Sequence, residues 1–180
     1  MRTLLTAVLL PLSLVLGGCV SQKQEPNDAN IGQAVKERMG GPKPICLLQS
    51  VNLEQLTSLP VSEETAKQIA DLSSLGLIEV EQDGELFVLH ATAKAQPFVR
   101  DAELCLAQYS YGKLKSLSGK KVTSSGLNTL LAHITPVIEP APNVPPHWLD
   151  GLSSIKEVRG MAAEMIQTEQ GWKAVSESLY

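Results

Sequence analysis

Aromatic side chains, cysteines and histidines are all scarce in this chain. Its 180 residues include two Trp, three Tyr, two Phe, three Cys and three His. A carbohydrate-binding platform usually gathers several aromatic rings on one exposed face, so the low aromatic content argues against one. Positive charge is also in deficit, with 15 Lys and Arg against 19 Asp and Glu. A mildly acidic chain lacks the cations that phosphates require, so we expect no nucleic-acid partner.

Sequence motifs for nucleophilic and metal-dependent catalysis are absent as well. The chain has no Gly-x-Ser-x-Gly elbow and no Ser-x-x-Lys followed by Lys-Thr-Gly. His90, His133 and His147 are too far apart for a local metal-binding motif. His90 and His133 both lie in strand-like runs and could meet across a sheet, although two ordinary surface histidines are the commoner arrangement. We therefore expect no metal, no cofactor and no enzymatic activity.

Long apolar runs are lacking, and the N-terminal one is short. Residues 4–16 supply about a dozen mostly apolar side chains interrupted by Pro11, which is too few to span a bilayer stably but suits a signal peptide. Arg2 precedes this run, and Leu16-Gly17-Gly18-Cys19 follows it directly. An ordinary membrane helix, or a signal peptide cut elsewhere, is the alternative interpretation.

The Leu16-Gly17-Gly18-Cys19 sequence is a lipobox, and the segment before it resembles a bacterial lipoprotein signal peptide. The resemblance implies that residues 1–18 are removed and that Cys19 is acylated with diacylglycerol and palmitate. Val20, and not an aspartate, follows Cys19. This is similar to the outer-membrane sorting pattern, which implies a protein anchored in the cell outer membrane and facing the periplasm. In a Gram-positive source, the same signal implies the outer face of the single membrane.

The expected mature chain has three parts. Removal of 18 of the 180 residues would leave 162, with 14 Lys and Arg against 19 acids and hence a net charge of −5. Residues 19–30 contain few bulky apolar side chains. We therefore expect them to form a flexible lipidated tether. Residues 31–180 have the length and apolar content of a single periplasmic domain.

Cys46 and Cys105 remain once Cys19 is assigned to the anchor. In an oxidising compartment, an even pair of cysteines predicts a disulfide. Closing the loop of about 60 residues between them contributes roughly 4 kcal/mol to stability in the chain-entropy model. Two buried free thiols or a metal pair are the alternatives, but the chain has no CxxC spacing that would favour a metal or redox site.

The periodicity of apolar residues predicts an α+β fold, with short helices packed on an antiparallel β-sheet. Helices are expected over residues 27–40 and 62–74, the second with Ser62 as its N-cap. The apolar face of the second helix is expected to contain Ala66, Ile69 and Ala70, followed by Leu72 or Ser73.

Strands are expected in three further regions of the chain. Asp83-Gly84 lies between two apolar runs and predicts a hairpin. From residue 102 the pattern is that of antiparallel strands, with residues 127–138 forming another strand. Prolines then predict an irregular stretch, residues 151–160 a short helix, and residues 162–176 a final hairpin.

Residues 62–95 resemble a winged-helix segment. The resemblance rests on the helix, the Leu75-Gly76-Leu77-Ile78 step, the hairpin and the Thr92-Ala93-Lys94-Ala95 turn. It implies DNA reading, but the helix carries three acids against one Lys67, and a groove-reading helix needs cations. The acids are Glu63, Glu64 and Asp71. We therefore expect shared local architecture without shared function.

The mature domain also resembles a diffuse group of uncharacterised small exported proteobacterial proteins. The motifs that carry the resemblance are Ile45-Cys46-Leu47, Leu104-Cys105-Leu106, Pro145-Pro146-His147-Trp148-Leu149 and Thr168-Glu169-Gln170-Gly171-Trp172. They span most of residues 45–176. The group offers no catalytic residues to transfer, so this resemblance bears on the fold and not on activity.

Two segments are candidates for binding. His147 and Trp148 lie in a proline-rich loop and could contact a ligand or partner, although Trp148 could instead close the edge of the core. Four lysines form the only basic cluster: Lys113, Lys115, Lys120 and Lys121. They could touch anionic lipid head groups or peptidoglycan carboxylates. The alternative is a solvated edge strand whose lysines block pairing with other sheets.

These observations predict a lipid-anchored, non-enzymatic envelope lipoprotein that binds or stabilises another envelope component. The alternative is a periplasmic protein that sequesters a small ligand or an antibiotic. A deep pocket lined by Trp148 would favour the ligand binder, and an exposed apolar patch would favour the partner binder.

Overall fold

The computed structural model describes residues 25–180. The expected signal peptide, Cys19 and residues 20–24 of the expected tether lie outside the described residues. The elements, in chain order, are α1 Asp28–Met39, β1 Lys43–Leu47, β2 Thr57–Ser58, α2 Glu63–Ser74, β3 Ile78–Asp83, β4 Leu86–Ala91, a 3₁₀ turn Gln96–Phe98, β5 Val99–Arg100, β6 Glu103–Val122, β7 Asn128–Pro140, α3 Pro146–Leu149, α4 Ser153–Lys156, β8 Met161–Thr168 and β9 Gly171–Leu179. The expected α+β fold with antiparallel sheets is confirmed.

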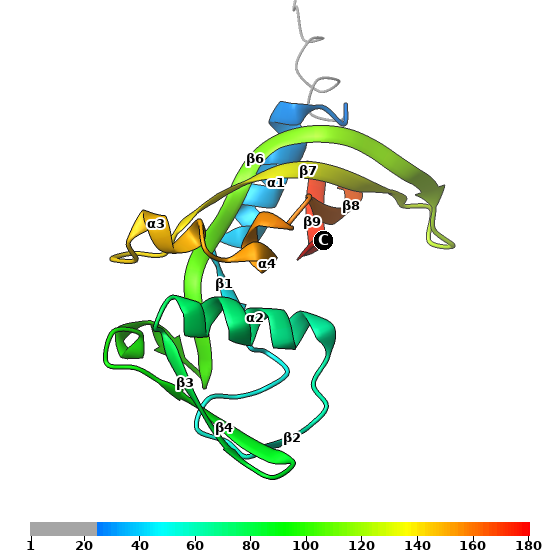
Figure 1. Ribbon diagram of the computed structural model, residues 1–180. Helices are drawn as coiled ribbons and strands as arrows, with labels where there is room; N and C mark the ends of the chain where they lie inside the picture. The colour runs from blue at the N-terminus through cyan, green and yellow to red at the C-terminus, as the bar shows by residue number, and fades with distance from the viewer. Residues whose placement is uncertain (1–24) are drawn as a thin grey trace, which may run out of the picture.

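The larger sheet curves around α1. Its strands are ordered β1-β6-β7-β8-β9, all antiparallel, and β5 also pairs with β6. Figure 1 shows β6 and β7 as an arch, with α1 crossing behind it. Buried side chains of α1 pack on the inward-facing side chains of the sheet: Ile31, Ala34, Val35 and Met39 against Leu130, Ala132, Ile134, Met161, Ala163 and Met165. We call α1 with the larger sheet the sheet body.

The curvature of the arch comes from irregularities in β6, which is 20 residues long. Its pairing with β7 shifts register at three places, and such bulges bend a strand and increase its twist. Tyr111, Leu114 and Leu117 all join the core beside α1, three residues apart and not two, because a bulge follows each of the first two. The spacing of the apolar side chains therefore fits a strand that bends around a helix.

Helix α1 begins earlier than the tether prediction allowed. Asn27 caps it, with its side-chain oxygen accepting a hydrogen bond from the backbone N–H of Asn30 at 3.0 Å. Gly40 ends it in the left-handed conformation, with φ +66°. The expected helix over residues 27–40 is confirmed. Residues 28–30, which the prediction assigned to the tether, belong to the first turn of this helix.

Residues 48–98 form a second lobe, inserted between β1 and β6, which we call the α2 lobe (Figure 1). It consists of α2 and a three-stranded sheet ordered β2-β4-β3. Its core includes Leu72, Leu77 and Leu89, all fully buried. Side chains from α3 and α4, which follow β7, complete this core. These are Trp148, Leu152 and Ile155.

The N-cap of α2 was predicted correctly, and its buried face in part: Leu72 is buried and Ile69 packs against the core, as expected. Ser62 accepts a hydrogen bond from the N–H of Thr65 at 3.1 Å, as a cap should. Thr65 and Leu72 are buried, whereas Ala66, Ala70 and Ser73 of the expected apolar face are exposed. Thr65 can be buried because its hydroxyl bonds to those of Ser50 and Ser62, at 2.7 and 2.8 Å.

The expected hairpin is present, shifted by one residue. Asp83 pairs with Leu86, so the two-residue loop is Gly84-Glu85 and not Asp83-Gly84. Gly84 has φ +62°, and a glycine at the first loop position is typical of a type II′ turn. The strand expected at residues 127–138, the helix within residues 151–160 and the final hairpin are also present, as β7, α4 and β8–β9.

Three contacts hold the α2 lobe in place. Cys46 of β1 and Cys105 of β6 are paired strand residues and form the expected disulfide. Asp71 of α2 accepts hydrogen bonds from the backbone N–H of Ser153 at 2.9 Å and from the Ser153 hydroxyl. Lys67 of α2 forms an ion pair with Glu157, just after α4. The lobe is therefore fixed at its base and along α2.

Candidate functional site

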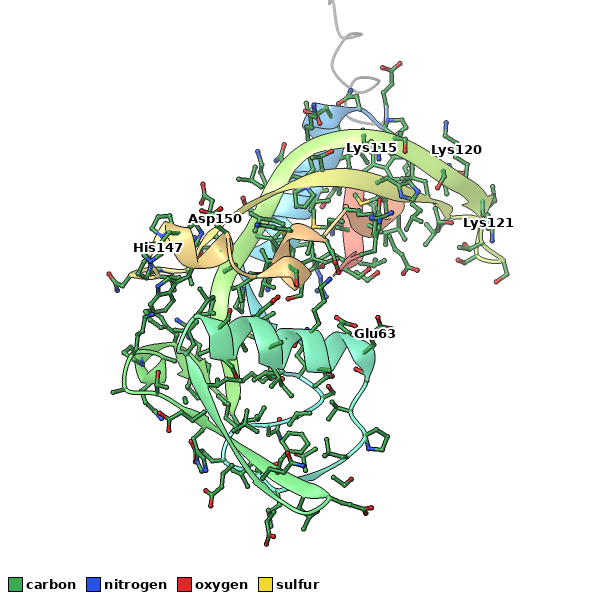
Figure 2. All side chains as sticks on the ribbon, viewed as in Figure 1. Glu63, Lys115, Lys120, Lys121, His147 and Asp150 are labelled. Atoms are coloured by element: carbon green, nitrogen blue, oxygen red, sulfur yellow. A yellow bond between two sulfur atoms is a disulfide. The ribbon has the colours of Figure 1, made fainter. Side chains whose placement is uncertain are left out.

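Four exposed lysines follow one another along the second half of β6, and we call them the lysine rim: Lys113, Lys115, Lys120 and Lys121. Figure 2 shows Lys115, Lys120 and Lys121 along the outside of the arch. Pairing of β1 with β6 ends at Tyr109, so beyond it the described β6 is an edge strand of the sheet. The four lysines therefore lie on an edge strand, as the alternative interpretation of this cluster expected.

The lysine rim is free of acidic neighbours along the chain. From residue 104 to residue 138 the sequence contains these four lysines and no Asp or Glu. In the part of the chain that the structure describes, none of the four forms an ion pair. Their charge therefore remains available on a protein whose net charge is −4.

The β6–β7 hairpin tip adds exposed apolar side chains to the lysine rim. Val122 and Leu127 are 67% and 42% exposed. Beside them is a pocket of about 330 Å³, lined mainly by the tip residues, by Leu130 and Trp172 of the sheet, and by Pro26. The start of the described chain is therefore in contact with the same pocket as Lys120 and Lys121.

Asp28 joins the start of α1 to the lysine rim. Its Oδ1 accepts hydrogen bonds from the backbone N–H of Leu114 at 2.6 Å and from the Tyr111 hydroxyl at 2.8 Å. The N–H of Leu114 lies between Lys113 and Lys115 on the open edge of β6. These hydrogen bonds, led by the one from Leu114, hold the pKa of Asp28 below its usual value of 3.8.

His147 and Trp148 of α3 differ in exposure, although their rings meet edge to face with centroids 6.5 Å apart. Trp148 is only 4% exposed and meets Phe98 edge-on, with ring centroids 5.7 Å apart. Lys94 places its Nζ 4.7 Å from the Trp148 ring centroid. His147 is exposed (Figure 2). Trp148 therefore closes the core edge, as the alternative interpretation held, and its ring is not an exposed ligand platform.

The three histidines do not form a common site. His90 lies on β4, where Glu54 is 2.6 Å and Glu81 3.4 Å from its ring nitrogens. The hydrogen bond to Glu54, more than that to Glu81, raises the pKa of His90 above 6.5. His133 lies on β7 of the sheet body, so the two do not meet across one sheet. Within residues 25–180, no group of three His, Cys, Asp or Glu could hold a metal ion.

His133 instead forms a hydrogen-bonded set that the sequence analysis missed. Ser118 Oγ lies 2.8 Å from His133 Nε2, and the Tyr180 hydroxyl lies 3.4 Å from Nδ1. Ser118 lies in β6, on the strand next to that of His133. A serine nucleophile needs a partner that stabilises the charged imidazolium, usually a carboxylate, and here that place is taken by a neutral phenol. The set orients His133 but is weakly suited to catalysis.

Exposed leucines gather at the far end of the α2 lobe, and we call them the wing face: Leu56, Leu59 and Leu86, which are 72%, 41% and 45% exposed. Leu56 and Leu59 flank β2, and Leu86 pairs with Ser58 of that strand. The N–H of Leu59 also donates to the carbonyl of Glu85, next to Leu86. Sequence reasoning missed this cluster because β2 is only two residues long and carries no strand signal.

A polar crevice of about 490 Å³ lies where α2, β1 and α4 meet. Its lining is rich in hydroxyl and amide groups, including Ser50, Ser62 and Gln68. Gln68 accepts a hydrogen bond from the N–H of Leu48, so most of these groups serve the packing between the elements. Ser154 Oγ is buried there without a partner among the described residues.

In residues 25–180 there is no helix with the length and apolarity needed to cross a membrane. Comparisons with protein-family models, with curated proteins and with solved structures found no match for this chain. The described geometry therefore carries the functional argument, with two surfaces available: the lysine rim and the wing face.

Proposed function

We propose that this protein is a lipid-anchored cell-envelope lipoprotein, without enzymatic activity, that binds another envelope protein through its wing face. The observation that carries the proposal is the cluster of exposed leucines at one end of the molecule. Exposed apolar side chains are tolerated singly on soluble proteins, but a cluster of them marks an interaction surface. A partner that covers Leu56, Leu59 and Leu86 would remove their apolar area from water.

The position of the wing face supports this proposal. In Figure 1 the α2 lobe is at one end of the molecule and the start of α1 is at the other. An acylated Cys19, nine residues before Asp28, would therefore anchor the end opposite to the wing face. The wing face would then project away from the outer membrane, toward the periplasm.

Export rests on two features of the chain. The lipobox at residues 16–19 resembles that of bacterial lipoproteins, and the Cys46–Cys105 disulfide is typical of proteins in oxidising compartments. We place the protein at the outer membrane because Val20 follows Cys19. None of this depends on the wing face, so anchor and partner can be tested separately.

The α2 lobe fits a winged-helix-like module used for protein contact and not for DNA. Its helix and hairpin follow the expected order, and the exposed part of α2 carries Glu63 and Glu64. These acids would repel phosphates, whereas the leucines beside the hairpin would suit a protein surface. The ligand-sequestering alternative has less support, since Trp148 is buried among Phe98 and Lys94.

Crosslinking in intact envelopes tests the proposal. The acylated protein is crosslinked, captured and compared with the double variant Leu56→Gln/Leu86→Gln. A matched control is Val137→Gln/Val175→Gln, because these valines are 43% and 42% exposed on the sheet body. We expect one envelope protein to be captured by the wild type and the control, and lost from the wing-face variant.

Two results would overturn the partner proposal. One is a captured set that equals that of an unrelated lipoprotein. The other is a captured protein that stays equally abundant in the wing-face variant. Anchoring is read separately, by incorporation of a palmitate analogue, which should depend on Cys19 and disappear in Cys19→Ala.

A further inference from the structure

We propose that the lysine rim and the β6–β7 hairpin tip dock on anionic phospholipid head groups of the membrane that holds the anchor. This inference rests on the proposed acylation of Cys19. It adds a second membrane contact, made by the folded domain itself, and with it a fixed orientation of the protein on the bilayer.

The chain between the proposed anchor and the domain is short. Because the described fold already includes Pro26, only seven peptide units separate Cys19 from it. Even fully extended, such a chain spans no more than about 25 Å. The proposed lipid anchor therefore keeps this end of the domain close to the head groups, where charge effects act within a Debye length of about 8 to 10 Å.

This short chain joins the domain beside the lysine rim. Pro26 lines the same pocket as Lys120, Lys121 and Val122. Asp28 is bonded to the N–H of Leu114, between Lys113 and Lys115. The start of the domain is therefore held against the lysine rim at two points, so the rim lies on the side of the molecule where the expected tether joins the domain.

The lysine rim and the hairpin tip are chemically complementary to anionic phospholipid head groups. Lysine ammonium groups pair with phosphate oxygens, and basic residues beside exposed apolar ones are the usual composition of a membrane-surface segment. The tip supplies both kinds of group, since Val122 follows Lys121 directly and is 67% exposed. The rim's own stretch of chain, residues 104–138, contains no acidic residue, and the Asp28 carboxylate beside it is hydrogen-bonded to the N–H of Leu114 and to the Tyr111 hydroxyl. An acidic protein thus presents a cationic edge beside its anchor.

A vesicle-exchange experiment tests this docking. The purified acylated protein is offered neutral phosphatidylcholine vesicles together with vesicles that also contain phosphatidylglycerol, and its distribution is measured after equilibration. We expect a preference for the anionic vesicles that falls about five-fold for each lysine removed, as in Lys120→Gln/Lys121→Gln. The same preference should weaken as salt is added.

The matched control is Lys156→Gln/Lys173→Gln, which removes the same charge from lysines outside the rim. It should retain the preference for anionic vesicles nearly unchanged. All these lysines are exposed, so the variants should fold, and their thermal unfolding is recorded to show it.

Three results would overturn the docking proposal. The wild type could distribute equally between the two kinds of vesicle. The rim variant and the control could lose the same preference, which would show a net-charge effect. The rim variant could lose binding to purified peptidoglycan sacculi while keeping its vesicle preference, which would assign the rim to the cell wall. Failure of the proposed anchor is distinguishable, because the protein would then carry no palmitate at Cys19.

Discussion

At the scale of single residues, Asp28 has more consequences than its exposed position indicates. Its carboxylate accepts hydrogen bonds from the N–H of Leu114 and the hydroxyl of Tyr111. These bonds join α1 to the open edge of β6. Burial and the neighbouring Asp28 also raise the pKa of Tyr111, so the phenol stays a hydrogen-bond donor. The ionised Asp28 therefore adds hydrogen bonds that hold the first turn of α1 against β6.

The stability contribution of Asp28 should depend on pH. Its pKa is lower in the folded state than the usual 3.8, so the charged form stabilises the fold above about pH 4. That contribution is lost as the pH falls through the folded pKa. We expect Asp28→Asn to melt below the wild type by a constant amount from pH 5 to 8, and the gap to shrink below pH 4. Thermal melts followed by circular dichroism measure this.

Asp83→Asn is the control for this prediction, since Asp83 is exposed on the hairpin of the α2 lobe. It should show no gap at any pH. A gap for Asp28→Asn that stays equally large at pH 3 would contradict the assignment of the effect to the carboxylate.

Individual residues show where sequence reasoning succeeds. Asn27, Ser62 and Gly40 were placed correctly at helix ends, because capping depends on a few neighbouring atoms. The role of Trp148 stayed ambiguous and the contact of Ser118 with His133 was missed, because both depend on distant segments. Phe98 and Lys94 surround Trp148, and His133 lies on the strand next to Ser118. No local pattern contains those contacts.

At the scale of elements, β6 is the part of the fold that most departs from regular geometry. Gly112 lies at its first bulge, between Tyr111 and Lys113. A Cβ at this position would lie 2.3 Å from the carbonyl oxygen of Thr135 and 3.2 Å from Cγ2 of Val137. Since backbone atoms of β7 cannot move aside cheaply, the close approach of the two strands requires glycine.

Gly112→Ala should therefore destabilise the protein by about 1 to 3 kcal/mol, the usual cost of overpacking. The measurement is the free energy of unfolding from a urea titration. Ser116→Ala is the control, because this exposed serine lies on the same strand and its replacement adds no atom. An unfolding midpoint for Gly112→Ala equal to that of the wild type would show that β6 and β7 separate easily.

The elements explain why the helices and hairpins could be predicted while the sheet order could not. Turn signals at Gly84 and after Thr168 are local, and each joins strands that are adjacent in sequence. The pairing of β1 with β6 joins strands separated by the whole α2 lobe. The buried face of α2 was predicted only in part, because Leu72 is buried as expected, whereas Thr65 is buried through hydroxyl hydrogen bonds that a hydrophobicity pattern does not register.

At the scale of the whole molecule, the disulfide closes the α2 lobe into a covalent loop. Cys46 and Cys105 are 59 residues apart in sequence and adjacent in the sheet, at the point where the chain leaves and re-enters the sheet body. We expect Cys46→Ser to lose roughly 4 kcal/mol of stability, because the unfolded chain is no longer restricted.

A non-reducing gel and a urea titration measure the loss together. The oxidised wild type should migrate faster than its reduced form, and Cys46→Ser should show no such difference. Cys105→Ser serves as the control, since it should match Cys46→Ser in both readings. An undiminished free energy of unfolding in both variants would contradict a structural role for the bond.

The sequence predicted the pairing of these two cysteines from their number and from the expected compartment alone. It did not reveal that they flank an inserted lobe, nor that the wing face and the lysine rim lie at opposite ends. Those relations depend on the curvature of β6 and on the crossing of α3 and α4 over the lobe. They are global properties of the packing, and single motifs do not encode them.

The closed loop has a mechanical consequence. If a partner pulls on the wing face while the N-terminus is held in a membrane, tension reaches the α2 lobe through β1. With Cys46 bonded to Cys105, the load divides at the base of the lobe between two covalent strands. One leads through residue 47 and the other through residue 104, so neither has to bear the whole force. When it connects a partner to a membrane, the disulfide-closed α2 lobe would then lengthen less under load than a lobe attached through one strand only.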